Sequence, residues 1–129
     1  NRQIITRKDE KEENMSDRIL FMGWNRAYVG LEKQSMKVFQ KGLEYLSKLQ
    51  KDGRIESYDI VTLTPHGGDL NAFVIVRGEG QKLAEILRDA TFAQIVSEAN
   101  FCIQGYGVVT GSIGTGAIKA LTHWASYAG

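Results

Sequence analysis

The chain has 129 residues, and 16 lysine and arginine residues against 15 aspartate and glutamate residues leave a net charge of +1. This length suits one domain, and the 43% hydrophobic and 24% charged residues exclude wholesale disorder. The near-neutral charge argues against a protein that binds nucleic acid mainly through its phosphates. The single cysteine, Cys102, excludes an intramolecular disulfide and is typical of a reducing compartment. No apolar run approaches the roughly 20 residues that span a bilayer.

The first residues of the chain are polar, since residues 1–14 hold four basic and four acidic side chains. Such a segment cannot offset its ordering entropy by burial, and it lacks the apolar core of a secretory signal. We therefore expect residues 1–16 to form a flexible tail, residues 17–129 to form the folded domain, and the protein to be cytoplasmic.

The first half of the domain alternates strand and helix patterns. Residues 18–24 form a short apolar run that predicts a buried strand. Residues 31–50 carry apolar side chains at helical spacing, and Asp52-Gly53 predicts the end of that helix. Residues 55–64 are rich in β-branched and aromatic types, which predicts a second strand.

The second half repeats this alternation after a turn cluster at residues 65–69. The turn predicts a hairpin into a third strand at residues 70–77. Helical spacing follows within residues 78–89, and Thr91 to Gln94 has the form of a capping box for a short helix that runs through Ala99. A fourth strand over residues 101–110, a glycine-rich connection at 111–116 and a terminal helix over 117–128 complete the expected elements.

This order predicts the ferredoxin-like fold, an α+β sandwich. A βαββαβ chain with a hairpin in the middle and right-handed crossovers gives an antiparallel four-stranded sheet, here with an extra C-terminal helix. The first and third strands are expected at the centre of the sheet, and they are also the most apolar.

Both faces of the predicted sheet are apolar, although two helices cover only one face. In the first strand, Ile19 and Phe21 oppose Leu20 and Met22, and the predicted third and fourth strands show the same double pattern. A patch of ~500 Å² per chain is worth roughly 12 kcal/mol of burial, against ~4–15 kcal/mol for association. A homodimer through the sheet faces is therefore expected, and the alternative is that the last helix folds back over the open face.

The element order, the length and the doubly apolar strands over residues 18–110 resemble the dimeric α/β-barrel superfamily. The resemblance implies a homodimer with a pocket for a small, mostly apolar metabolite. It also implies cofactor-free chemistry of the monooxygenase or isomerase kind, and hence no bound cofactor. A non-catalytic ligand-binding or stress-associated module is the alternative, because fold alone does not select a reaction.

Six residues are candidates for this site. His66, with Asp69 three residues away in the predicted turn, is the candidate general base, and Asn25 is the second candidate catalytic residue. Amphipathic rings suit a pocket for a planar, partly polar ligand. The candidate substrate-binding residues are therefore Trp24, Tyr28, Tyr58 and Tyr106. Two histidines without a cysteine cluster predict no metal site.

Particular residues bear on three further classes of binding protein. The glycines at 111–116 resemble part of a phosphate loop, but Ala117 and Ile118 stand where lysine and a hydroxyl residue are needed. Segments 20–22 and 72–74 are similar to pieces of the RNA-recognition motif, without its closing aromatic or its basic residue. Amino-acid-binding regulatory domains share the same topology. We expect a small-molecule partner and neither a nucleic acid nor a membrane.

Overall fold

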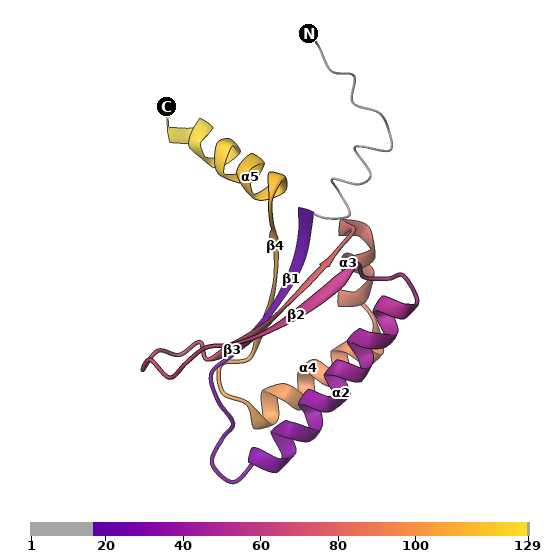
Figure 1. Ribbon diagram of the computed structural model, residues 1–129, viewed down its shortest axis with the longest axis vertical. Coiled ribbons are helices and arrows are strands. Elements are labelled where there is room, and N and C mark those ends of the chain that lie inside the picture. Colours follow the sequence, from indigo (N-terminus) through magenta and orange to yellow (C-terminus); the bar gives the residue numbers. More distant parts are fainter. Residues whose placement is uncertain (1–16, 129) are drawn as a thin grey trace.

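A computed structural model describes residues 17–128 of the chain, and the expected tail at residues 1–16 lies outside the described residues. The elements follow in chain order (Figure 1). They are β1 (Arg18–Trp24), α2 (Glu32–Lys51), β2 (Ser57–Thr62), β3 (Ala72–Gly78), α3 (Gly80–Leu87), α4 (Ala90–Cys102), β4 (Gly107–Ser112) and α5 (Thr115–Ala125), which ends in a 3₁₀ turn (Ser126–Ala128). Among the described residues, no helix is long and apolar enough to cross a membrane.

The four strands form one sheet in the order β2-β3-β1-β4, and each neighbouring pair is antiparallel. This confirms the predicted ferredoxin-like α+β arrangement, with the first and third strands at the centre. In the register of the central pair, Phe21 faces Ile75 and Met22 faces Val74. Alternate residues of both strands therefore point to opposite sides of the sheet.

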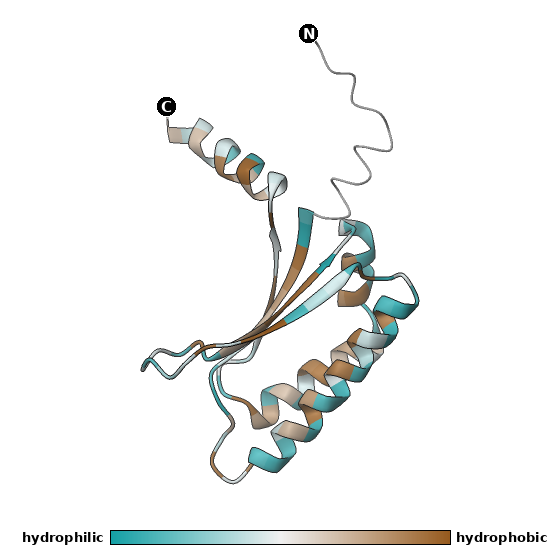
Figure 2. Cartoon of the chain, viewed as in Figure 1, coloured by the Kyte–Doolittle hydropathy of each residue, from teal (hydrophilic) through white to brown (hydrophobic). Residues whose placement is uncertain are grey.

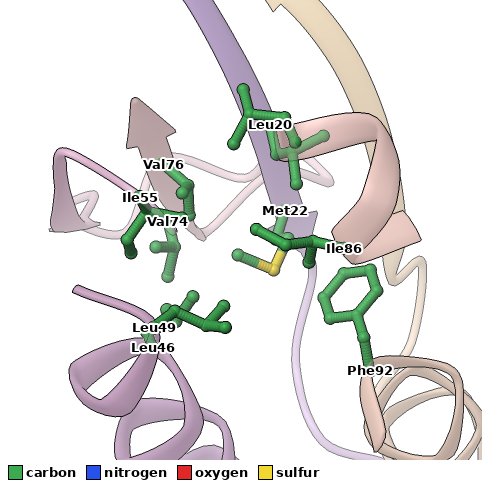
Figure 3. Close-up of a cluster of buried hydrophobic side chains, with 10 residues drawn as sticks. Leu20, Met22, Leu46, Leu49, Ile55, Val74, Val76, Ile86 and Phe92 are labelled. Carbon is green, nitrogen blue, oxygen red and sulfur yellow. The ribbon is translucent and has the colours of Figure 1, made fainter. Parts of the chain in front are cut away.

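One side of the sheet is covered by α2, α3 and α4 (Figure 1). Figure 2 shows that these helices turn their apolar stripes toward the strands and their polar stripes outward. The core between the two layers joins β1, β3 and all three helices (Figure 3). It contains Leu20, Met22, Leu46, Leu49, Ile55, Val74, Val76, Leu83, Ile86 and Phe92.

Helix α2 ends where the sequence predicts. Gly53 has a φ of +75°, and Arg54 N donates to Leu49 O at 2.8 Å, which satisfies a carbonyl of the last turn. The charges also suit the helix dipole, because Glu32 lies in the first turn and Lys48 and Lys51 lie in the last.

The expected fourth strand is wrong over residues 101–106. Helix α4 continues through Cys102, whose thiol donates to Glu98 O at 3.3 Å, and β4 begins only at Gly107. Cys102 and Ile103 pack with Val38 and Ala99, so their apolar character serves the helix layer and not a strand face. Gly105, with a φ of +64°, then turns the chain into β4.

The capping-box interpretation at Thr91 is also wrong. Helix α4 begins at Ala90, and Asp89 caps it by accepting a hydrogen bond from Thr91 N at 2.9 Å. Asp89 also forms an ion pair with Arg54 at 3.2 Å. The residue two positions upstream therefore supplies the cap, and the first helical turn follows it directly.

The second side of the sheet has no covering element among the described residues, and we call it the open face. It presents Ile19, Phe21, Phe73, Ile75 and Val109, which alternate with the buried residues of their strands. The Phe21 and Phe73 rings lie 5.1 Å apart. The alternative in which the last helix folds back over this face is not observed, because α5 projects away from the sheet (Figure 1).

Candidate functional site

A cavity of about 60 Å³ lies between the sheet and the helices α2 and α4. Five aromatic side chains line it: Trp24, Phe39, Tyr45, Phe92 and Tyr106. Aliphatic side chains fill the rest of its wall, among them Val38, Leu43, Leu46, Val74, Ile95 and Ile103. An apolar wall with a few hydroxyl groups is the usual composition of a small-molecule site.

The aromatic side chains form two groups. Trp24 contacts Phe39 edge-on at 6.0 Å between ring centroids and stacks on Tyr106 at 6.4 Å. Tyr45 stacks on Phe92 at 6.1 Å. Each group joins elements that are distant in the sequence, so the fold brings the rings together.

The lining residues that carry polar side-chain groups are Trp24, Tyr45 and Tyr106. Burial raises the pKa of Tyr106 to about 12. Burial, with the Asp89 carboxylate as the second cause, raises the pKa of Tyr45 to about 12. The Tyr45 hydroxyl is buried and lies near the Asp89 carboxylate. Both hydroxyls therefore stay protonated near neutral pH, and Tyr106 can donate a hydrogen bond to a ligand atom.

Gly42 lines the cavity from the middle of α2. Glycine inside a helix costs about 0.5–1 kcal/mol relative to alanine. The nearest atom to a Cβ placed at this position would be Ile95 Cγ2 at 3.9 Å, which is an ordinary contact distance. Packing therefore does not require glycine here, and its absent side chain leaves space in the cavity.

Trp24 and Tyr106, two of the four predicted substrate-binding residues, line the cavity. Tyr58 lies outside it, where its hydroxyl shares a 2.8 Å hydrogen bond with Ser47. Tyr28 also lies outside the cavity and is 45% exposed on the loop after β1.

The two predicted catalytic residues also lie outside the cavity wall. His66 belongs to the β2–β3 hairpin, where Nδ1 accepts from Gly68 N at 3.1 Å and Nε2 donates to Leu70 O at 2.9 Å. Both ring nitrogens are thus bound within the turn, and neither bond goes to Asp69. The Asn25 side chain accepts a hydrogen bond from Asn71 Nδ2, which ties the end of β1 to the hairpin.

Sequence reasoning missed Phe39, Gly42, Tyr45 and Phe92 as cavity residues. Three of them lie on α2, where they belong to the stripe that faces the sheet. The signal in the sequence is Gly42. Alanine is more stable than glycine in the middle of a helix, so a glycine there indicates that space is needed.

Comparison with known proteins supports the fold. No family model matches the sequence, and no curated protein matches it. A hydroxynitrile lyase from Passiflora edulis is similar in structure at 12% identity and a TM-score of 0.59, over 77% of this chain and 95% of that one. A dimeric ferredoxin-like protein of unknown function from Thermobifida fusca gives 13% identity and a TM-score of 0.56, over 76% and 92%.

A third similar structure is a putative antibiotic biosynthesis monooxygenase from Chloroflexus aurantiacus, at 14% identity and a TM-score of 0.50, over 77% of this chain and 95% of that one. Likenesses at such identity concern the fold and not the reaction. The chain therefore has the ferredoxin-like fold of these proteins, as its element order predicted.

Proposed function

We propose that this protein is a homodimer, joined through the open faces of its sheets, in which each subunit binds a small, mostly apolar metabolite in the cavity beneath the sheet. The observation that carries the ligand site is the cavity itself, with its aromatic wall, its two tyrosine hydroxyls and the space left at Gly42. The lone cysteine, Cys102, is buried and unpaired, in keeping with a cytoplasmic protein.

The wall defines the chemistry of the ligand. Trp24, Tyr106 and Phe92 offer ring faces and edges to a planar molecule, and Tyr106 offers a hydrogen-bond donor to a carbonyl or ether oxygen. The cavity wall contains no charged side chain, so an ionised group on the ligand would have to remain outside. An aromatic or lactone-like molecule meets these conditions.

The test uses Gly42, because a side chain added there should stabilise the helix and, if it is large, occupy the space for the ligand. Gly42→Ala should raise the free energy of unfolding by about 0.5–1 kcal/mol, through helix propensity. Gly42→Leu should fill the cavity and abolish binding. Native mass spectrometry of the purified protein identifies a co-purifying small molecule. Titration of Trp24 fluorescence, with Trp124→Phe present in every variant, measures its affinity.

Gln40→Ala is the matched control, because Gln40 is exposed on the same helix and lies outside the cavity wall. This variant should keep the affinity of the unmodified protein. A ligand that binds Gly42→Leu as tightly as the unmodified protein would place the binding site elsewhere.

A catalytic role is the second candidate function, and the names of two similar proteins, a lyase and a putative monooxygenase, support it. Here His66 would move a proton while Asn25, Trp24 and Tyr28 orient the substrate. His66→Ala separates the two functions: turnover lost with ligand binding retained supports an enzyme. Undiminished turnover of an identified substrate by this variant would remove His66 from the mechanism.

RNA is the competing occupant of the open face, since Phe21 and Phe73 occupy its two central strands. The net charge of +1 favours a second copy of the chain over a polyanion. A filter-binding assay across salt concentrations decides between them, and salt-sensitive retention of RNA would contradict the proposed dimer face.

A further inference from the structure

Helix α5 exposes one continuous apolar stripe. Ile118, Leu121 and Trp124 are 64%, 60% and 66% exposed, and Tyr127 in the following turn is 77% exposed. At 100° per residue these side chains share one half of the helix, whereas Lys119, Thr122 and Ser126 occupy the other half. Large apolar side chains in such a row mark an interaction surface.

The direction of α5 is built into the fold. Ile113 N donates to Asp17 O at 3.0 Å, and a Cβ placed at Gly116 would lie 2.9 Å from Asp17 Cβ. The first turn of α5 is thus in close contact with the residue that precedes β1. The Asp17 carboxylate also lies near Gly114, where it complements the positive end of the helix dipole.

A helix of this length needs a packing partner. Helix α5 has 11 residues, and isolated helices shorter than about 12–15 residues are marginal in water. Within residues 17–128, its contacts run chiefly to β4 and to its own 3₁₀ turn, and α2, α3 and α4 lie on the other side of the sheet (Figure 1). Its stability must therefore come from a surface outside these residues.

Three occupants can be compared on their chemistry. Residues 1–16 carry only Ile4, Ile5 and Met15 as large apolar side chains, too few to cover the stripe. A membrane surface requires a polar face rich in lysine and arginine, and α5 has Lys119 alone. A second copy of this chain has an apolar open face of its own. In the proposed dimer, that face packs against the open face of this chain and so brings further apolar surface close to α5.

We infer that α5 is an arm that packs its apolar stripe against the partner subunit, an inference that rests on the proposed sheet-face dimer. Four strands of six or seven residues present a face of about 400 Å². Two such faces bury roughly 800 Å², below the 1,200–2,000 Å² typical of a stable interface. Each docked arm, about 16 Å long and 10 Å wide, buries about 160 Å² of its own surface and as much of the partner subunit. Two arms therefore raise the total to roughly 1,400 Å², within that range.

The test follows Trp124 by fluorescence. The chain has two tryptophans, so Trp24→Phe leaves Trp124 as the single reporter. Its emission should be blue-shifted in the dimer and should shift to the red on dilution, at the concentration where light scattering shows the mass halving. If Trp24→Phe does not fold, the difference spectrum between the unmodified protein and Trp124→Phe reports the same signal.

Substitutions on the two halves of α5 sharpen the test. Leu121→Ser should raise the dimer Kd at least tenfold, whereas Thr122→Ala, on the polar half, should leave it unchanged. A dimer with fully exposed Trp124 emission would overturn the arm while leaving the sheet-face dimer intact. A monomer at all concentrations would overturn both.

Two other results also contradict the inference. Blue-shifted emission that persists in the monomer would mean that α5 packs on its own chain. Emission that shifts to the blue only when anionic phospholipid vesicles are added would assign the stripe to a membrane surface.

Discussion

The two sides of the sheet are built from the same strands, yet they differ in what covers them. Leu20 and Phe21 are neighbours in β1, but Leu20 is 1% exposed under the helices while Phe21 lies on the open face. One side is completed within the chain by α2, α3 and α4 and encloses the cavity. The other side also presents large apolar side chains, and no element within residues 17–128 covers it. In the proposed dimer, alternate residues of one strand would therefore serve folding and association separately.

The largest expected effect is loss of the dimer on placing a charge in the open face. Phe21→Asp should raise the dimer Kd by at least 100-fold, because a two-fold interface would bury two unpaired carboxylates. Sedimentation across a dilution series measures the change. Thr110→Asp is the control, since Thr110 pairs with Leu20 in the register and points to the helix side. An unchanged mass for Phe21→Asp would refute the open face as the interface.

Alanine at the two neighbouring positions of β1 should separate folding from association. Leu20→Ala should lower the free energy of unfolding by about 3 kcal/mol, at any protein concentration, because it leaves a cavity in the core. Phe21→Ala should have an effect that grows with protein concentration, because it weakens the dimer. Denaturant titrations at two concentrations distinguish the two patterns, and equal behaviour of the variants would contradict the division of roles.

The helix-covered side should also respond to pH through the cap of α4. A hydrogen bond from Thr91, followed by the Arg54 ion pair, lowers the pKa of Asp89. Asp89 therefore contributes stability above its unfolded pKa of 3.8, and this contribution is lost as the pH falls through the folded pKa. Asp89→Ala should lower Tm by several degrees at neutral pH and by less in acid. Asp89→Asn keeps a capping oxygen and should have the smaller effect.

The smallest effect is expected in alkali, where the buried tyrosines titrate. Tyr106 has a pKa of about 12 against an ordinary value of 10.0, so the native state keeps its proton longer than the unfolded chain does. Stability should therefore fall between these two values as the pH rises. Tyr106→Phe should reduce the slope of this loss by about one proton, as measured by denaturation at several pH values. Tyr28→Phe, outside the cavity, is the comparison.

The strand order and the central strands could be predicted because local patterns and a short hairpin restrict the topology to few choices. Residues 101–106 were misassigned because Phe101, Cys102 and Ile103 form an apolar run that suits a buried strand and a helix end equally well. The cavity was predictable only in part. Trp24 and Tyr106 carry a signal in their residue type, whereas Tyr45 and Phe92 meet only through the packing of two helices.

A sheet that is apolar on both sides lacks the usual free-energy penalty against a shift in strand register. A one-residue slip of β1 would exchange Leu20 and Phe21 between the two sides, and hydrophobicity alone would hardly penalise the exchange. Local polar contacts must then fix the register of the strands. Asn71 supplies two of them, from its backbone N to Trp24 O at 2.9 Å and from its side chain to Asn25. Asn25 thus helps to fix the register of β1 against β3, through the hydrogen bond that it accepts from Asn71.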